Sequence, residues 1–482
     1  MERIGNKGQS SLLKMPIIIN QYMELESNSI SSKFSKSAAW LACLFFCITI
    51  ILIPFRFRYL LLERPTPPVY KDFTDFHLFG SDIAVLALLA FWGLSLLFAR
   101  RPVRLGPNFM WFPLAGLIFT GLVTSFTSLD VELSLYHTLR LAALFLFYLY
   151  VVNEVLSRSL IVVAITFQVV VQSLTALAQF FLQNSVGLES FGEHGLDPAV
   201  RGVSIVSTGV TRVLRSYGLT EHPNILGGCL ALGLIILLSV YLHGRQNTRL
   251  SIMLVMMLGL SALFVTFSRS AWLAFIIGAS ILLGAVAHRR EWKKLQSGLW
   301  LALISLLVLT PLVWSYAGYV GARLNVGGSF TKNPYENRSI AERLLLDEAG
   351  IHIFLDKPFN GVGLGASALA IKKYFPDFRG SFVPHLVLLA VAMETGIVGL
   401  TFYIFLLLFP WVALLRNKIN LLGKPMLLVT SGLLVAITII GLLDIYPWLL
   451  PPGRLWQWLI WGLWVVAYEF DNRNFVTDNM PS

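Results

Sequence analysis

Residues 223–242, PNILGGCLALGLIILLSVYL, form the stretch that decides the fold. The run carries no Lys, Arg, Asp or Glu. At about 1.5 Å of rise per residue it is long enough, as a helix, to cross a hydrocarbon core of roughly 30 Å. In lipid the backbone amides must be satisfied within the segment, so this run predicts a membrane-spanning α-helix.

Similar runs recur along the whole chain. The 482 residues are 56% hydrophobic and only 13% charged, whereas soluble domains carry roughly 25% charged residues. About twelve runs of roughly 17 to 25 residues account for the deficit. They lie at about 38–55, 82–98, 107–125, 136–154, 159–182, 223–242, 250–267, 270–287, 297–316, 384–410, 426–443 and 455–469. We therefore predict an all-α integral membrane protein with about twelve transmembrane helices.

Basic residues predict the orientation of these spans. If the N-terminus is cytoplasmic, every short cytoplasmic loop holds basic residues, as the positive-inside rule requires, while long outer loops are exempt from that rule. These basic residues are Arg100, Arg101, Arg104, Arg158, Arg245, Arg249, Arg289, Arg290, Lys293, Lys294, Arg416, Lys418 and Lys424. The short loop at 126–135 on the other side has neither Lys nor Arg. The outer loops are then about 56–81, 126–135, 183–222, 267–270, 317–383 and 444–454.

Spans and loops together divide the chain into segments. We expect a cytoplasmic tail at 1–37, a transmembrane bundle at 38–182, a periplasmic loop at 183–222, helices six to nine at 223–316, a long periplasmic loop at 317–383, C-terminal spans at 384–469 and a cytoplasmic tail at 470–482. No small-residue cleavage site follows the first apolar run, so we expect a signal anchor there. In the long loop, Ser339-Ile340-Ala341-Glu342 resembles a capping box and predicts the start of an amphipathic helix that roofs a cavity at the membrane surface.

The composition argues against several classes of function. The net charge of +11 is explained by loops that orient a membrane protein, so it does not predict nucleic-acid binding. Cys43, Cys47 and Cys229 all fall inside apolar runs, where we expect small core residues rather than ligands. The sequence has no Asp-x-Asp pair and no His/Cys cluster at ligand spacing, so we predict neither a catalytic metal nor a cofactor.

Three single arginines stand out for their positions on the predicted outer side, where the orientation rule does not favour positive charge. Arg215 shortly precedes the sixth span, Arg269 sits in the tight turn after the seventh, and Arg140 lies one turn inside the fourth. A guanidinium at a membrane edge is costly unless it snorkels, pairs with an acid or meets an anion. The planar guanidinium can bind two oxygen atoms of a diphosphate at the same time. We predict an anion site, and an ion-paired anchor is the alternative for each arginine taken alone.

Two histidines are candidates for a proton acceptor. His385 and His222 each lie beside a proline at the outer start of a predicted span, and an imidazole titrates near neutrality. The residues alone do not rank the two. Glu394 follows on the same predicted helix, on the face opposite His385, and we expect it to be a structural carboxylate that binds a neighbouring helix.

The stretch at 361–365, Gly-Val-Gly-Leu-Gly, predicts a turn.

Four stretches resemble, in order, signatures of the bacterial O-antigen ligase and O-antigen polymerase superfamily. They are Arg215…Gly218…Glu221-His222-Pro223-Asn224-Ile225-Leu226-Gly227-Gly228; Thr266-Phe267-Ser268-Arg269-Ser270-Ala271; Arg343…Ile353-Phe354-Leu355-Asp356-Lys357-Pro358-Phe359-Asn360-Gly361-Val362-Gly363-Leu364-Gly365; and Pro384-His385…Glu394-Thr395-Gly396-Ile397-Val398-Gly399-Leu400. The resemblance covers roughly residues 205–470. Leu386 stands where many members have Asn.

This resemblance implies a GT-C-like fold in the bacterial inner membrane, with the active site facing the periplasm. It also implies that a glycan passes from undecaprenyl diphosphate to an acceptor hydroxyl of a glycan or lipid. His385 would accept the proton, and Arg215 and Arg269 would stabilise the diphosphate. The substrate-binding set would be completed by Arg140, His222, Asn224 and Arg343. One base and no enzymic nucleophile predict a single, inverting displacement without a metal.

Alternatives remain open at this point. A polymerase, a ligase and a protein O-oligosaccharyltransferase would share the same donor, and the sequence does not separate them. A transporter or flippase of the lipid-linked glycan belongs to a different class. It would be expected to have two matching halves with interrupted spans, and the sequence has no such repeat. The polar residues lie mostly in the outer loops, so we favour an enzyme.

Overall fold

The computed structural model describes residues 30–154, 158–200, 202–324, 334–378 and 382–478. In these ranges the chain is mostly helical, and eleven helices are long and apolar enough to cross a membrane. They are α2 (Ile30–Leu52), α3 (Gly80–Phe98), α4 (Asn108–Ser125), α5 (Val131–Glu154), α6 (Arg158–Leu182), α7 (Pro223–His243), α8 (Arg249–Val265), α9 (Arg269–His288), α10 (Trp292–Ser315), α14 (Val387–Arg416) and α15 (Pro425–Leu443). The prediction of an all-α, multi-pass membrane protein is confirmed.

The twelfth predicted span, 455–469, lies within helix α17 (Pro451–Asp478), which is not among those eleven. Arg454 and Gln457 lower the hydropathy of its first turns. Its tryptophans Trp456, Trp461 and Trp464 are almost completely buried, and the helix packs against α5, α15 and the short helix α16 (Tyr446–Leu449). The apolar surface of α17 therefore faces other helices of the bundle.

Helix α7 is the centre of the bundle. Of its most apolar stretch 89% is buried, against 11% for the peripheral helix α10, and it packs against α6, α8, α9 and α15. Two glycines at its start allow this close packing. A Cβ at Gly227 would come within 2.9 Å of the Ala271 Cβ, and one at Gly228 would overlap the Tyr446 hydroxyl. The N-terminus of α7 is thus held tightly between α9 and α16.

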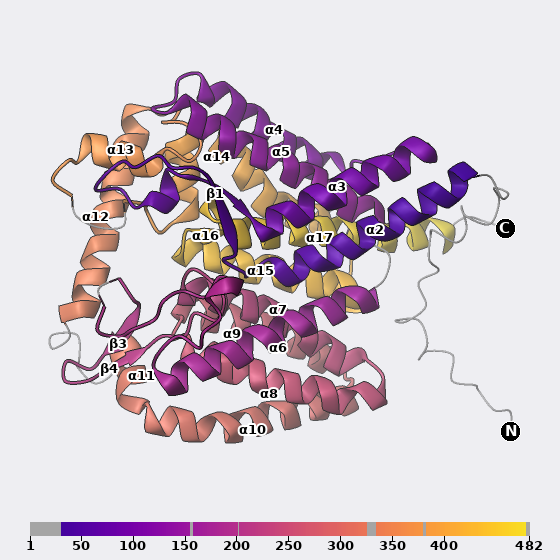
Figure 1. Ribbon diagram of the computed structural model, residues 1–482. Helices are drawn as coiled ribbons and strands as arrows, with labels where there is room; N and C mark the ends of the chain where they lie inside the picture. Colours follow the sequence, from indigo (N-terminus) through magenta and orange to yellow (C-terminus); the bar gives the residue numbers. More distant parts are fainter. Residues whose placement is uncertain (1–29, 155–157, 201, 325–333, 379–381, 479–482) are drawn as a thin grey trace, which may run out of the picture.

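The predicted outer loops gather at one end of the bundle. Figure 1 shows α11 (Ala317–Leu324), α12 (Pro334–Asp356) and α13 (Ser367–Tyr374) at the end opposite the two termini. Two antiparallel hairpins that the sequence did not predict lie in these loops: β1 (Arg58–Leu62) with β2 (Phe76–Phe79), and β3 (Ile205–Ser207) with β4 (Arg212–Leu214). The remaining short helical turns are η1 (Lys71–Phe73), η2 (Glu189–Phe191), η3 (Gln246–Thr248) and η5 (Leu421–Gly423).

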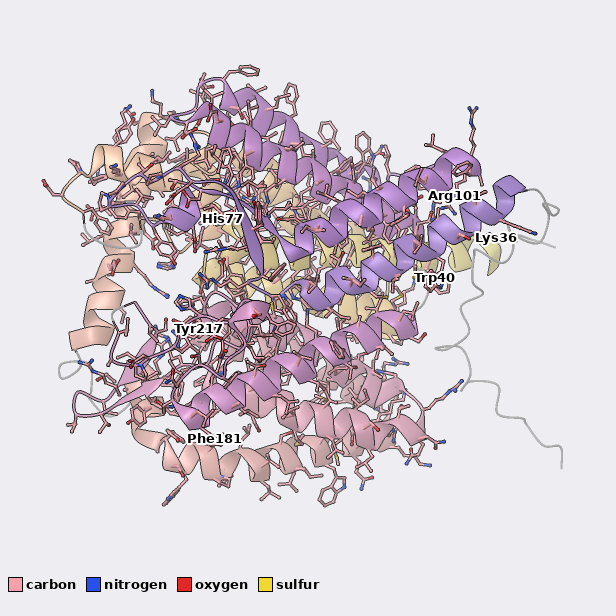
Figure 2. The ribbon with its side chains drawn as sticks, viewed as in Figure 1. Lys36, Trp40, His77, Arg101, Phe181 and Tyr217 are labelled. Atoms are coloured by element: carbon pink, nitrogen blue, oxygen red, sulfur yellow. The ribbon has the colours of Figure 1, made fainter. Side chains whose placement is uncertain are left out.

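Hydrogen bonds between loops show that they share one end of the molecule. Arg64 Nη2 donates to Asp130 at 2.8 Å and so joins the first predicted outer loop to the second. Arg58 Nη1 donates to Glu221 Oε1 at 2.6 Å and joins the first to the third. Lys36 and Arg101 lie toward the opposite end, where the termini are (Figure 2). This separation agrees with the predicted grouping of loops; their placement in the periplasm stays a prediction.

Helix α12 differs from its prediction at its start. It begins at Pro334, so Ser339-Ile340-Ala341-Glu342 lies inside the helix, and the prediction that this stretch opens the helix was wrong. The helix crosses the loop end of the bundle, roughly perpendicular to the spans (Figure 1). It buries Leu346, Ala349 and Ile353 against the rest of the protein, chiefly α14. Its exposed apolar residues are Leu344, Leu345, Ile351 and Leu355.

Helix α14 also begins later than predicted and is interrupted. It starts at Val387, so His385 precedes the helix instead of occupying its first turn. At Gly396, with φ 65°, the helix is kinked. The turn at 361–365 packs into this kink: Val362 N donates to Met393 O at 2.8 Å, and Ile397 N donates to Pro358 O at 2.7 Å. The turn prediction is confirmed, and its function is to brace α14.

Glu394 lies at this brace and is fully buried. It accepts hydrogen bonds from Ser367 Oγ at 2.8 Å and Trp448 Nε1 at 2.8 Å. The expectation of a structural carboxylate is confirmed, since Glu394 joins α14 to α13 and α16.

Replacing Gly361 by Ala should destabilise the protein. The residue has φ +60°, and an added Cβ would come within 2.5 Å of the Glu394 backbone. Left-handed backbone costs a non-glycine residue roughly 1–2 kcal/mol, and the overlap adds to that cost. We expect a lower thermal midpoint in detergent. Gly284→Ala is the control, because a Cβ there meets nothing within 4 Å. An equal midpoint for both variants would contradict this role of the turn.

Candidate functional site

His385 lies near α12, which carries Arg343 and Asp347, and near Asp444 at the end of α15. Its backbone N–H donates to the carboxylate of Asp347 on α12. Burial lowers the pKa of the imidazole; the nearby charge of Asp444 raises it and that of Arg343 lowers it further. The Nδ1 atom is buried and has no hydrogen-bond partner among the residues that the structure describes. The side chain is therefore neutral at neutral pH, and in the tautomer protonated at Nε2 its Nδ1 can accept a proton.

A chain of three side chains runs beside this histidine. Arg215 Nη2 donates to Asn224 Oδ1 at 2.5 Å, and Asn224 Nδ2 donates to Asp444 Oδ2 at 2.6 Å. Arg215 Nε also donates to Thr266 O at 2.8 Å. All three members of the chain are buried. The chain fixes the guanidinium of Arg215 and connects the loop before α7 with the end of α15.

The structure distinguishes the two candidate histidines. His222 is the N-cap of α7: its Nδ1 accepts the backbone N–H of Asn224 at 3.1 Å. Its Nε2 lies 3.0 Å from Ser204 Oγ. Burial lowers the pKa of His222 well below the ordinary value, and the charges of Arg215 and His385 lower it further. Both ring nitrogens of His222 are occupied, whereas Nδ1 of His385 is not, so His385 is the better proton acceptor.

The tight turn before α9 brings two more arginines to this region. Arg269 is the first residue of α9, and its Nη1 donates to Arg323 O at 3.1 Å. Arg323, on α11, donates from Nη2 to Phe267 O at 3.1 Å. Because Arg215 also bonds to this turn, at Thr266, the predicted residues Arg215 and Arg269 are brought together around it.

The roof helix α12 contributes the predicted residue Arg343. The positive charge of Arg343 lowers the pKa of both His385 and His222, after the larger effect of burial. Asp347, one turn later on α12, accepts the backbone N–H of His385. The expectation that the helix covers a polar site therefore agrees with the positions of these two charges.

Arg140 lies in a neighbouring pocket and is paired with an acid. Its Nη2 donates to both carboxylate oxygens of Asp82, at 2.8 and 2.7 Å, and the guanidinium lies 5.3 Å from the centre of the Tyr136 ring. It helps to line a small pocket of about 30 Å³, enough for one or two water molecules, which opens to the surface. The ion-paired anchor, the alternative interpretation of this arginine, describes it well.

Sequence reasoning missed Asp444, Arg323 and Asp347. Asp444 is a lone acid directly after the apolar run of α15, and Arg323 is a single arginine on the outer side. The rule that an isolated charge at a membrane edge needs a partner, applied to the three arginines, would also have selected these two. Asp347 lies among other charges on α12, and only the packing of that helix against His385 distinguishes it.

Comparison with known proteins found one family whose model matches part of the chain. Residues 252–404 match the model of the O-antigen ligase family. This segment holds Arg269, Arg323, Arg343 and His385, while Arg215, Asn224 and Asp444 lie outside it. No curated protein matches the chain. The family implies a glycan-transferring, ligase-type enzyme that works with lipid-linked glycans and polysaccharides. The match covers about a third of the chain, 153 of its 482 residues, so this segment is similar to the O-antigen ligase family.

Proposed function

We propose that this protein transfers a glycan from undecaprenyl diphosphate to an acceptor hydroxyl, with inversion at the anomeric carbon and without a metal ion. The transfer takes place at the loop end of the bundle, facing the periplasm of a bacterial inner membrane. The observation that carries the proposal is the position of His385. This neutral, half-buried imidazole has a ring nitrogen that no described residue contacts by a hydrogen bond, and it lies in the field of Arg343 on α12 and of Asp444, which Asn224 connects to Arg215.

The proposed step is a single displacement. The acceptor oxygen forms a bond to the anomeric carbon while its proton passes to Nδ1 of His385. The bond from that carbon to the diphosphate oxygen breaks, and the diphosphate leaves with both electrons. Proton transfer of this kind contributes typically 10²–10⁴-fold to a rate. His385 ends the step protonated and returns its proton to water.

Positive charge at the leaving group is the second requirement. Arg215 and Arg269 would stabilise the diphosphate as its charge develops, and Arg343 would face it from the roof. Arg215 is positioned in advance by Thr266 O and Asn224, so little reorganisation is needed when the charge appears. Guanidiniums bind two phosphate oxygens at once, which supplies the positive charge that a metal ion would otherwise provide.

The other predicted residues take positioning roles in this scheme. Asn224 orients Arg215, and His222 caps α7 so that Asn224 stays in place. Arg140 is already paired with Asp82, so we place it outside the group that binds the diphosphate.

The acceptor distinguishes the members of this class. A polymerase extends a second lipid-linked glycan, a ligase uses a lipid, and a protein O-oligosaccharyltransferase uses a protein hydroxyl. We favour polymerase or ligase. A gene deletion examined by surface-polysaccharide gel separates them: loss of long chains indicates a polymerase, and long chains left on the carrier lipid indicate a ligase. A flippase would not release undecaprenyl diphosphate from the purified donor.

His385→Ala should abolish transfer while the protein still inserts and binds the donor. Loss of the base predicts a fall of roughly 10²-fold or more in undecaprenyl diphosphate released from purified donor and acceptor. His352→Ala is the matched control, since His352 is exposed on α12 and should leave the rate unchanged. Full activity of His385→Ala would overturn the assignment of the base.

Arg269→Lys should also be strongly impaired, because an ammonium group is a point charge and cannot bind two phosphate oxygens in a fixed plane. The rate of transfer should fall at least tenfold, with normal protein yield. Arg290→Lys, in the short segment after α9 at the opposite end, is the control. Transfer by Arg269→Lys at the parent rate would exclude a forked contact.

Asp444→Asn should move the acid limb of the pH profile. Transfer needs neutral His385, so activity falls as the pH drops through its pKa. The charge of Asp444 raises that pKa, so its removal lowers the pKa, and kcat/KM should persist to lower pH. Glu469→Gln, on the distant end of α17, should not shift the limb. A shift of the acid limb of kcat/KM to higher pH in Asp444→Asn would contradict the proposed effect of Asp444 on His385.

A further inference from the structure

A polar pocket lies beside the loop that precedes α7. It lies between β2, α5, the loop before α7 and the start of α17. The residues that matter for its chemistry are Arg58, Tyr136, His137, Arg140, Glu221 and Arg454. Glu221 is the neighbour of His222 in sequence, and α16 joins this pocket to Asp444. The pocket is therefore built partly from the same segments that carry the proposed transfer site.

Two of the three arginines in the pocket are neutralised by acids. Arg58 pairs with Asp72 and with Glu221, each at 2.6 Å. Arg140 pairs with Asp82 at 2.7 Å. Arg454 is different: among the residues that the structure describes, it forms no salt bridge.

Arg454 is also deeply buried, with 3% of its surface exposed. Its Nε donates to Trp448 O, and its Nη1 lies 3.2 Å from His137 Nδ1. Nη2 is buried and has no partner. The nearby carboxylate of Glu394 is occupied by Ser367 and Trp448. A buried charge without a counter-ion costs several kcal/mol, and an anionic ligand in the adjoining pocket would remove that cost.

The pocket, at about 30 Å³, has room for an oxyanion, and the sugar that carries the oxyanion would lie at its open mouth. Phe79 and Tyr136 supply aromatic surface, and the carboxylates of Asp72 and Glu221 can accept hydrogen bonds from hydroxyl groups. Three carboxylates line the pocket alongside the three arginines, so a ligand with the charge density of a diphosphate is disfavoured. A single oxyanion on an otherwise neutral, hydroxylated ring fits this mixed lining better.

We infer that this pocket is a saccharide subsite in which the guanidinium of Arg454 binds an oxyanion on a sugar of the donor glycan, either a carboxylate or a phosphate substituent. The inference rests on the proposed function for the identity of the donor and deepens it by naming an acidic glycan as substrate. It assigns to Arg454 a role in selecting the substrate, separate from the chemical step at His385.

Binding without turnover tests this inference. In the absence of acceptor, the affinity of purified protein is measured for three polyprenyl-diphosphate disaccharides that differ only in one sugar: glucose, glucuronic acid or glucose 6-phosphate. A hydrogen bond to a charged group contributes about 1.5–3 kcal/mol, so Arg454→Gln should weaken binding of the preferred acidic donor roughly tenfold or more. The neutral donor should bind as before. The two acidic donors distinguish a carboxylate from a phosphate.

Matched variants distinguish a role of Arg454 in selecting the donor from a role in the stability of the fold. Arg454→Lys keeps the charge and should retain part of the preference for the acidic donor. Arg104→Gln removes an arginine that contacts the other end of α17, at Glu469, and should change no affinity. The thermal midpoint of ligand-free Arg454→Gln should not fall, because an unpaired buried charge is removed. A large fall in that midpoint, also for Arg454→Lys, would show that the arginine is structural.

Other outcomes would overturn the inference. Equal weakening for neutral and acidic donors would place Arg454 at the diphosphate or in the fold, and no weakening for any donor would exclude the subsite. The outcome is independent of the test of His385. If His385→Ala retained full activity, the proposed mechanism would fail, yet the comparison of donors would still report whether the pocket selects an anion.

Discussion

The chain of hydrogen bonds from Arg215 through Asn224 to Asp444 holds the proposed site together. Its members come from the loop before α7, the first turn of α7 and the end of α15. The chain can form only because Gly227 and Gly228 let α7 approach α9 and α16 closely. Buried polar groups are costly unless every member has a partner, so this chain fixes the relative positions of the three segments. The free nitrogen of His385 lies within the field of the same aspartate.

Physical chemistry of the bilayer explains how much of the fold could be predicted. Apolar runs such as 223–242 must be helices in lipid, and the basic loops group by side, so the spans and the shared end of the outer loops were predictable. Helix α17 was predicted as a span, yet its tryptophans face other helices. The hairpins β1–β2 and β3–β4 and the true start of α12 depend on contacts between distant loops, which periodicity within one segment does not contain.

The site was predictable to a similar degree. Isolated arginines on the outer side led to Arg215 and Arg269, and the structure brings both to the 266–269 turn. The family resemblance favoured His385 over His222, but the residues alone could not rank them, because the physical difference depends on Ser204 and on the N-cap geometry that occupy the ring of His222. The pairing of Arg140 with Asp82 could not be foreseen either, since the two residues lie on different helices.

The two proposals assign the diphosphate to the arginines of the 266–269 turn and an acidic substituent of the sugar to Arg454. An experimental structure with bound undecaprenyl diphosphate tests this most directly, through the positions of its two phosphorus atoms. The account predicts both phosphorus atoms within about 4–5 Å of the guanidiniums of Arg215 and Arg269, the range of direct charge-assisted hydrogen bonds. Phosphorus density between Arg140 and Arg454, or at the end of the bundle that carries the termini, would contradict it.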